Sequence, residues 1–385
     1  MQITEARLKV VYLAEWDAFN DSGVLLKITG QVKTWRLLGA EAHLLLISPR
    51  SAQPPSISLD MEGVVLESYA NENPLTKKFH KGAAFRRIRK AATALKPDVI
   101  YYRDSSWSPG LNGVLRNGRI SVFEINSGSS ELWLQRSGGF GVMMLGLLSR
   151  EWLRGKADGF VCVTPEIGLE FDKYGKPVHV VTNGYDVEAV ALSPAPSNIR
   201  PKLVFVASTN QAWQGIDKLG WLAESLPEYE FHLVGPIIEG PPNLCCHGYL
   251  THADLGQLYR QMDVGIGSLA LHRKHLKEAC PLKVREYLAH GLPVIGAYND
   301  PDCVGSSFFL ELPNRENFDD VDLAHIRTFV DSWRGKRVDG QEIVLRIGAK
   351  GKEQQRLEFF EALVARTTKG VKSNLLSSSG MLSCI

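Results

Sequence analysis

The sequence predicts an α/β protein built from two Rossmann-like halves. At 385 residues the chain has room for two domains, because about 150 residues per domain is usual. Short apolar and β-branched runs alternate with helical stretches in both halves, a pattern typical of parallel βαβ units. The stretch Leu192–Arg200 contains two prolines and several polar residues, as linkers do. We therefore expect domains at 1–191 and 201–348, joined by a linker at 192–200.

Each domain contains a series of predicted strands separated by helical patterns. In the first domain the strands are expected at Lys9–Ala14, His43–Ser48, Val99–Tyr102, Ile120–Ile125, Gly159–Val163 and Val178–Val181, with helices such as Leu25–Leu38 and Phe85–Leu95. In the second domain they are expected at Lys202–Ala207, Tyr229–Val234, Leu244–His247, Val264–Ser268, Pro293–Ala297 and Phe308–Leu310. The amphipathic segment 349–368 is expected to form a helix that packs back toward the first domain. The Ser-rich segment 369–385 is expected to be a disordered tail.

Composition excludes several classes of protein. The net charge is +2, with 44% hydrophobic and 22% charged residues, which excludes collagen-like, low-complexity and wholly disordered chains. The six cysteines form no CxxC pair and show no ligand spacing, so neither a disulfide framework nor a zinc site is expected. The longest uncharged apolar stretch, Ser137–Ser149, is too short to span a bilayer. We expect a cytoplasmic protein, or one bound peripherally to the inner face of a membrane, and we expect no cofactor.

The most informative segment is Leu271–Gly296, in which a basic loop precedes a short helix and a buried strand. Pro281 suits the start of this helix and Gly291 suits its left-handed exit, so the helix is expected to run to His290. The free N–H groups at its start favour an anion such as a diphosphate. Formal positive charge is added there by Arg273, Lys274, Lys277 and Lys283.

Two glutamates flank this helix start. Glu278 lies in the loop and Glu286 lies about one and a half turns inside the helix, so they are too far apart for a close acid/base pair. We expect them to contact different parts of one extended ligand, because a carboxylate accepts hydrogen bonds from both hydroxyls of a sugar diol. The alternative is that both are solvated charges at a helix end.

The Glu278-x7-Glu286 spacing, followed by YLAHGLPVIG, resembles the donor-site signature of GT-B fold glycosyltransferases of the family 4 type. Other matching segments follow in order: FEINSG, VVTNGYD, LVFVASTNQAWQGIDKL, FHLVGP and CCHGYLTHADLGQLYRQMDVGIG. The resemblance implies two facing Rossmann-like domains with an interdomain cleft. It also implies metal-independent transfer of a sugar, with retention of anomeric configuration, from a nucleotide-diphosphate donor.

The resemblance assigns roles to individual residues. It implies that Glu286 binds the nucleotide ribose and that Glu278 holds sugar hydroxyls, with backbone N–H groups near Pro281 and Leu282 on the phosphates. The catalytic set is then Glu278, Lys274 and Lys283, and the remaining donor-binding set is Glu286, Pro281, Leu282, Arg273, Gly215, Gln214, Gly248 and Tyr249. One departure is Gln214, which stands where many members carry a lysine. We expect the basic loop and Lys283 to supply that charge.

On the acceptor side the sequence leaves alternatives open. Asp21 and Gly23, after the first strand, and Glu124 and Asn126, at a strand end, either line the cleft or only form turns. The acceptor is expected to be a glycan or a lipid-linked glycan.

A basic segment of the first domain has the composition of a membrane-binding helix. Lys77–Lys96 carries eight Lys and Arg residues and no acid, with Phe79, Phe85 and Ile88 interleaved. We interpret it as an amphipathic helix that lies on an anionic membrane surface. The alternatives are a solvated helix face and a nucleic-acid-binding patch. Of these, nucleic-acid binding is not expected. The apolar stretch Leu132–Leu148 either extends this surface or is a buried helix.

Together these observations predict a glycosyltransferase of surface polysaccharide or glycolipid biosynthesis. Two other classes remain open. A nucleotide-sugar epimerase or hydrolase of the same fold would form product without an acceptor. A non-catalytic nucleotide- or glycan-binding subunit would account for Gln214.

Overall fold

The computed structural model describes residues 7–20, 22–128, 140–192, 194–207 and 211–379, which form two parallel sheets. The first sheet has the order β3-β2-β1-β4-β5-β6-β7 and all its strand pairs are parallel. Its strands are β1 (Lys9–Glu15), β2 (Glu41–Pro49), β3 (Val64–Tyr69), β4 (Val99–Arg103), β5 (Ile120–Ile125), β6 (Gly159–Cys162) and β7 (Val178–Val180). The helices between them are α1 (Gly23–Leu37), α2 (Pro74–Leu95), α3 (Leu111–Leu115), α5 (Phe140–Arg154) and α6 (Pro165–Phe171).

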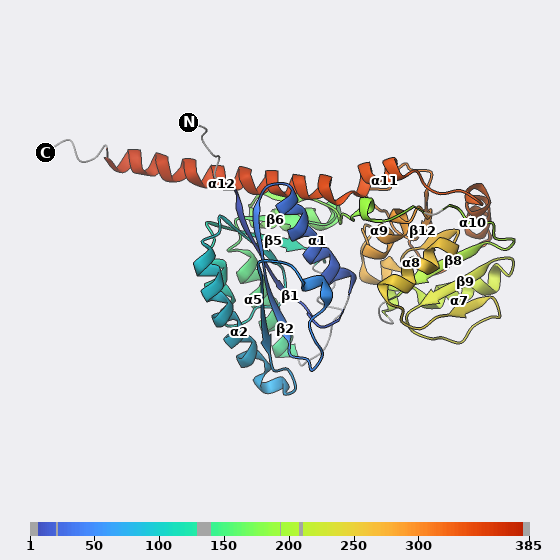
Figure 1. Cartoon of the computed structure of the whole chain (residues 1–385), viewed down its shortest axis with the longest axis horizontal. Coiled ribbons are helices and arrows are strands. Elements are labelled where there is room, and N and C mark those ends of the chain that lie inside the picture. Colours follow the sequence, from blue (N-terminus) through green and yellow to red (C-terminus); the bar gives the residue numbers. More distant parts are fainter. Residues whose placement is uncertain (1–6, 21, 129–139, 193, 208–210, 380–385) are drawn as a thin grey trace.

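The second sheet has the order β10-β9-β8-β11-β12-β13 and is also parallel. Its strands are β8 (Lys202–Val206), β9 (Glu230–Val234), β10 (Leu244–Cys246), β11 (Val264–Ile266), β12 (Val294–Gly296) and β13 (Phe309–Glu311). Its helices are α7 (Ile216–Ser225), α8 (His252–Gln261), α9 (Leu282–Ala289), α10 (Asp320–Trp333) and α11 (Gly340–Ile347). The two units lie end to end, with α12 (Ala349–Ser379) running along one side of the first (Figure 1).

The strands form where they do because both faces of each sheet are covered. Along β1 the side chains alternate between two buried clusters: Val11 and Leu13 pack with Phe85, whereas Val10 and Tyr12 pack with Trp35. A strand buried on both faces appears in the sequence as a continuous apolar run. The twelve predicted strands are all present, with ends shifted by no more than two residues. The strand that was not predicted, β3, is a half-buried edge strand whose sequence includes a glutamate, so no apolar run marks it.

The basic helix α2 belongs partly to the core, which corrects the sequence interpretation. Phe85 and Ile88 are fully buried, so they are not available to a membrane, whereas Phe79 remains 74% exposed. The Lys81 side chain is also buried, in an ion pair with Glu15. The helix is amphipathic because it covers a sheet, and this geometry produces the same periodicity as a membrane-bound helix.

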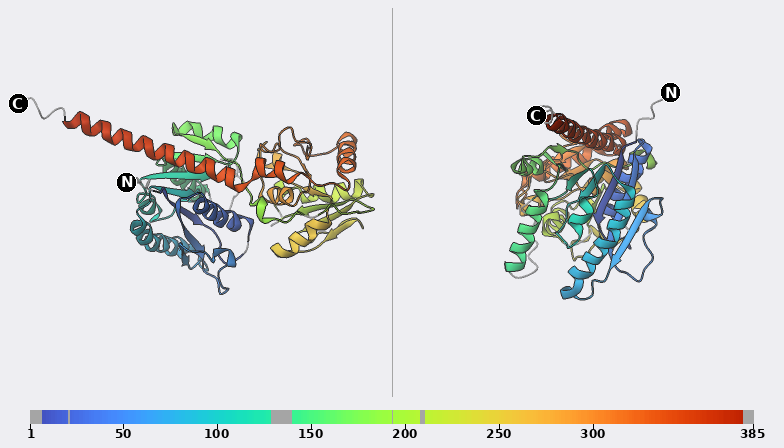
Figure 2. Two further views of the ribbon diagram at one scale, coloured as in Figure 1. Left: turned by 45° about the horizontal axis from the view of Figure 1, so that its top comes forward. Right: turned by 90° about the vertical axis from the view of Figure 1, so that its left-hand side faces the viewer.

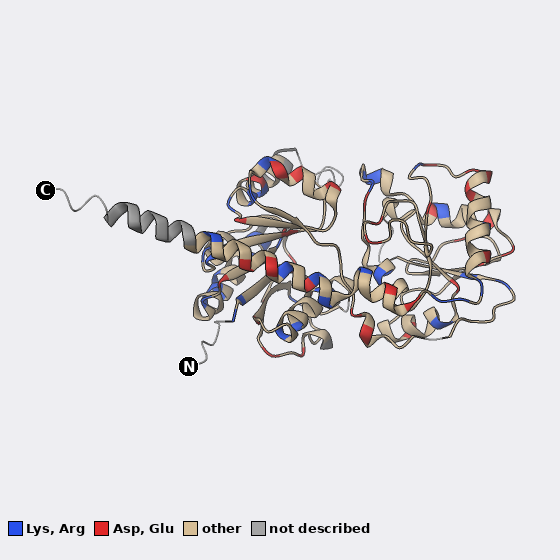
Figure 3. Ribbon diagram, turned by 90° about the horizontal axis from the view of Figure 1, so that it is seen from above, with Lys and Arg blue, Asp and Glu red and all other residues tan. Residues whose placement is uncertain are grey.

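The helix α12 crosses back to the first domain and packs against α1 (Figure 2). Leu357, Phe360 and Leu363 join the cluster around Trp35, and the Phe360 ring lies 5.1 Å from that of Tyr101. Figure 3 shows acidic and basic residues alternating along its outer side. The helix continues to Ser379, eleven residues past the expected end at 368, so residues 369–379 are helical and do not belong to the disordered tail that was expected. Within the described residues, no helix is long and apolar enough to cross a bilayer.

A buried ion pair anchors α12. Arg356 is fully buried and donates to the Glu353 carboxylate and to the backbone oxygens of Val181 and Thr182, at 3.1 and 3.2 Å. The other carboxylate oxygen of Glu353 accepts from Trp35 Nε1 at 2.7 Å. Burial raises the pKa of Glu353 although Arg356 opposes that shift. The pair therefore joins α12 both to α1 and to the segment after β7.

We expect R356A to lower the free energy of unfolding by about 3–5 kcal/mol, because it leaves the Glu353 carboxylate buried without its cation. Urea denaturation followed by circular dichroism measures this. The matched control is R366A, an exposed arginine on the same helix, which should change stability by less than about 0.5 kcal/mol. Equal values for the two variants would contradict this account of the anchor.

Candidate functional site

The loop before α9 lies in the seam between the two domains, at the carboxyl ends of strands in the first sheet. Cys280, in this loop, donates its Sγ–H to the backbone oxygen of Val163, after β6, at 3.2 Å. Asn183, after β7, donates its Nδ2–H to the Cys280 carbonyl at 2.7 Å. Leu282 lies against Gly23, where an added Cβ would be 3.7 Å from the leucine side chain. The predicted donor segment is thus enclosed by the first domain.

Glu278 makes a reciprocal contact with Glu166, the second residue of α6. Its Oε2 accepts from the backbone N–H of Glu166 at 2.7 Å. In return, Glu166 Oε2 accepts from the backbone N–H groups of Lys277 and Glu278, each at 2.8 Å. The predicted sugar-binding carboxylate is therefore oriented by a residue of the other domain.

The helix α9 begins and ends close to where the sequence predicts. Pro281 is its N-cap residue, and Gly291 has a φ of 75°, the left-handed exit that favours glycine. Arg285, in the middle of the same helix, is fully buried. It binds Asp300 through two nitrogens at 2.7 and 2.8 Å, and its Nε donates to the Asn183 carbonyl at 2.9 Å. It is a structural residue because each of these partners is buried with it.

Glu286 projects from the middle of α9 with 13% of its side chain exposed. Tyr259 Oη, from α8, donates to its Oε2 at 3.1 Å, and His252 Nδ1 lies 3.2 Å from its Oε1. Burial, reinforced by the nearby Glu286 charge, raises the pKa of Tyr259, so the phenol stays protonated and keeps donating. A fixed, partly exposed carboxylate of this kind suits a pair of sugar hydroxyls.

Lys283 carries a buried ammonium group. Its Nζ has no hydrogen-bond partner among the described residues and lies 3.7 Å from the centroid of the Phe205 ring, on β8. Burial lowers the pKa of Lys283 to about 7. The resemblance places the donor phosphates at the backbone N–H groups near Pro281 and Leu282, which directly precede Lys283 in the chain.

Arg273 is paired with two carboxylates and is not the free phosphate-binding cation that the sequence suggested, whereas the catalytic role of Lys274 stays a prediction. Arg273 binds Asp217 at 2.7 and 2.9 Å, and its Nε donates to Glu316 at 3.1 Å. Hydrogen bonds to these two carboxylates raise the pKa of the guanidinium group. Lys274 Nζ lies 3.9 Å from the centroid of the Trp213 ring. Arg273 is therefore neutralised by two carboxylates, and its bond to the Ala212 carbonyl at 2.8 Å makes it a brace for the glycine turn.

The expected turns around the donor site have distinct geometries. Gly215 has a φ of 77°, and a Cβ there would lie 2.8 Å from the Leu269 Cβ, so only glycine fits. Gln214 is buried, and its backbone oxygen accepts from Leu269 N at 3.0 Å. Gly248 has a φ of 68° and its carbonyl accepts from Gly235 N at 2.8 Å. Tyr249, next to it, is 69% exposed and available to stack on a base.

On the acceptor side, Glu124 and Asn126 both contact Lys27 but differ in their exposure. Glu124 is fully buried and pairs with Lys27 Nζ at 2.7 Å and Arg103 Nη1 at 3.2 Å. Burial alone would raise the pKa of Glu124, but these two charges lower it well below its usual range. Glu124 therefore belongs to the core and not to an accessible acceptor surface. Asn126, which is half-buried, accepts from the same Lys27 Nζ at 2.8 Å. Asp21 lies outside the described residues.

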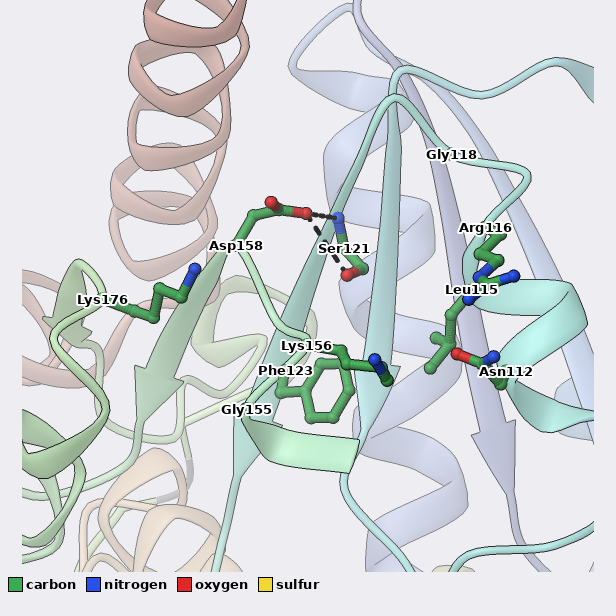
Figure 4. A pocket seen from close by; sticks show the side chains of 10 residues that line it. All are labelled: Asn112, Leu115, Arg116, Gly118, Ser121, Phe123, Gly155, Lys156, Asp158 and Lys176. Carbon is green, nitrogen blue, oxygen red and sulfur yellow. Dashed lines mark hydrogen bonds between the residues drawn. The ribbon is translucent and has the colours of Figure 1, made fainter. Parts of the chain in front are cut away.

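A cavity of about 430 Å³ lies elsewhere in the first domain (Figure 4). Its lining includes residues at the amino ends of three strands: Ser121 is the second residue of β5, Asp158 precedes β6 and Lys176 precedes β7. It therefore opens at the amino edge of the sheet, opposite the edge that meets the α9 loop. No group of three or more His, Cys, Asp and Glu side chains within the described ranges is arranged to hold a metal ion.

Sequence reasoning missed several residues that shape this site. Glu166 and Asn183 come from the first domain, Tyr259 from α8, and Lys27 from α1. The start of α6 does have a local sequence signal, since Thr164 precedes Pro165 and its Oγ1 accepts a hydrogen bond from the backbone N–H of Ile167 at 3.3 Å. Nothing local indicates that Glu166 meets a loop more than a hundred residues away.

No protein-family model and no curated protein matches the chain. Solved structures do match, over nearly the full length of both chains. The glycosyltransferase from Rickettsia africae ESF-5 is 15% identical with a TM-score of 0.61, covering 92% of this chain and 99% of its own. The catalytic domain of Starch Synthase IV from Arabidopsis thaliana, bound to ADP and acarbose, is 14% identical with a TM-score of 0.59, covering 94% and 100%.

A third similar structure is the lipopolysaccharide outer core galactosyltransferase WaaB in its apo form. It is 11% identical with a TM-score of 0.57, covering 95% of this chain and 99% of its own. At these identities the likeness establishes the fold alone. The chain has the GT-B fold, with two facing Rossmann-like domains, as the sequence predicted.

Proposed function

We propose that this protein is a glycosyltransferase that moves a sugar from a nucleotide-diphosphate donor to a glycan or lipid-linked acceptor. The observation that carries the proposal is the pair of side chains on α9. Glu286 presents a fixed, partly exposed carboxylate, and Lys283, three residues earlier, presents an ammonium group without a partner in the described chain. A ribose diol and a diphosphate are the groups that such a pair would bind.

In this proposal each residue has a defined task. Glu286 accepts hydrogen bonds from the ribose hydroxyls, and Glu278 accepts them from the donor sugar. Lys283 stabilises the diphosphate as the bond between its oxygen and the anomeric carbon breaks and the acceptor oxygen bonds to that carbon. We further propose that the reaction needs no metal or cofactor and retains anomeric configuration, as the family 4 type resemblance implies. Surface polysaccharide or glycolipid biosynthesis would be its setting.

Nucleotide binding should protect the protein against heat. At about 100 times its Kd, a nucleotide stabilises the folded state by about 2.7 kcal/mol. We expect one of UDP, GDP, ADP or CMP to raise the Tm of the wild type but not that of E286A, as measured by scanning fluorimetry. The matched control is E361A, an exposed glutamate on α12, which should respond like the wild type. If no nucleotide protects the wild type, the proposed donor site is wrong.

Lys283 should take up a proton when the nucleotide binds. Its pKa of about 7 in the free protein means that it is mostly neutral at pH 8, and a bound diphosphate favours the charged form. We expect uptake of about 0.9 proton at pH 8 and about 0.1 at pH 6 from this group. Titration calorimetry in buffers of different ionisation enthalpy measures the uptake, and K283M isolates the contribution of Lys283. Identical uptake by both proteins would contradict the role.

An anionic membrane surface is the proposed site of the acceptor. The support comes from the outer face of α2, where Phe79, Arg86 and Lys90 are exposed and lie on one side of the helix by their spacing. Leu148 and Trp152, on α5, are also 62% and 50% exposed. Basic residues interspersed with large apolar ones suit an interfacial helix.

This surface predicts binding to vesicles that contain acidic lipids. We expect the wild type to float with such vesicles and R86E/K90E to float several-fold less, because each basic residue near the surface contributes about 1 kcal/mol. The control K336E/K350E changes the same charge at two exposed lysines outside α2 and should float like the wild type. Equal flotation of all three proteins, or flotation of none, would remove the membrane from the proposal.

A further inference from the structure

We propose that Glu166 is a positioning residue. It fixes Glu278, the residue proposed to bind the donor sugar, only while the two domains are in contact. The inference rests on the proposed function and deepens it, because it assigns part of sugar recognition to the domain that does not bind the nucleotide. Glu166 is half-buried at the start of α6, two residues after the N-cap residue Thr164.

The contact works in both directions. The Glu166 carboxylate accepts two backbone N–H groups of the donor loop, from Lys277 and Glu278, at 2.8 Å each. The Glu166 N–H donates to Glu278 Oε2 at 2.7 Å. Hydrogen bonds to a carboxylate are about twice as strong as neutral ones, and all three converge on two consecutive residues. The main chain and the side chain of Glu278 are both held by one residue of the other domain.

The second domain holds the opposite side of the same loop. Asn299, after β12, donates its N–H to the Lys277 carbonyl at 2.9 Å and accepts from Ala279 N at 3.1 Å. The loop therefore lies between Asn299 on its own domain and Glu166 on the other. Truncating the Glu166 side chain removes the two bonds that hold Lys277 N and Glu278 N. The backbone N–H of residue 166, the contacts of Cys280 and the buried Arg285 cluster on α9 remain.

This arrangement separates sugar recognition from nucleotide recognition. Glu286 and Lys283 lie on α9, whose position does not depend on Glu166, so binding of the nucleotide alone should be independent of the contact. Glu278 uses Oε2 on Glu166 and keeps Oε1 for a sugar hydroxyl. A donor that carries its sugar should therefore bind and react well only when the Glu166 contact is made.

The test compares E166A and E166Q with the control D172A, at an exposed carboxylate that directly follows α6. The ligands are the nucleotide that protects the wild type and its common sugar-bearing forms, with Kd measured by calorimetry and kcat and KM by donor turnover. We expect E166A to weaken binding of the sugar donor on the order of tenfold and to leave the Kd of the nucleotide unchanged. E166Q keeps an accepting oxygen and should stay within about threefold of the wild type, as should D172A.

The outcomes separate the two proposals. If E166A weakens the nucleotide and the sugar donor equally, Glu166 only supports the fold and the inference is overturned. The same holds if E166A binds and turns over the sugar donor like the wild type. Circular dichroism and the Tm of each variant show whether it folds. If E166A does not fold, the E166Q variant decides alone. A roughly tenfold loss of affinity for the sugar donor, but not for the nucleotide, in E166Q would contradict positioning by an accepting oxygen. If the wild type binds no nucleotide, the proposed function fails first and takes this inference with it.

Discussion

The buried guanidinium of Arg285 is the interaction on which the arrangement of the site depends. It joins α9 to Asp300 and to the Asn183 carbonyl of the first domain, and its Nη2 also donates to Asp302 at 2.8 Å. Asp302 in turn accepts from Lys352 Nζ, in the first turn of α12, at 2.6 Å. A charge buried at this depth is tolerable only with all its partners present. One side chain therefore fixes α9 relative to both domains and to the helix that crosses between them.

Much of the fold could be predicted because parallel strands buried on both faces appear as apolar runs. The exit of α9 could also be predicted, since glycine at a left-handed position has a local cause, as at Gly291. Arg285 could not. In the sequence it differs little from Lys283, two residues earlier, and its burial depends on Asp300 and Asn183. Asn183 is 102 residues away, so no local pattern shows that these partners converge on it.

The same limit applies to the candidate site. A sequence shows which charges are present but not how they are paired: Arg273 was expected on a phosphate, whereas Asp217 and Glu316 hold it. Periodicity also has more than one cause, because Phe85 has the spacing of a membrane-facing residue and is a core residue of α2. Glu278 was identified from its spacing to Glu286, but its partner Glu166 was not, because their contact exists only once two domains meet.

The departure at Gln214 and the state of Lys283 have a common physical explanation. With glutamine at the glycine turn, that turn supplies no cation, and Arg273 beside it is already neutralised by two carboxylates. Lys283 reaches the neighbouring strand from α9 instead, with the ring of Phe205 as its closest described cation–π contact. In the free protein this buried ammonium group has few interactions that stabilise its charge, and burial accordingly lowers its pKa. A bound diphosphate would favour the charged form of Lys283 and accept hydrogen bonds from its ammonium group. The ligand would thus provide the hydrogen-bond partner that this group lacks among the described residues of the free protein.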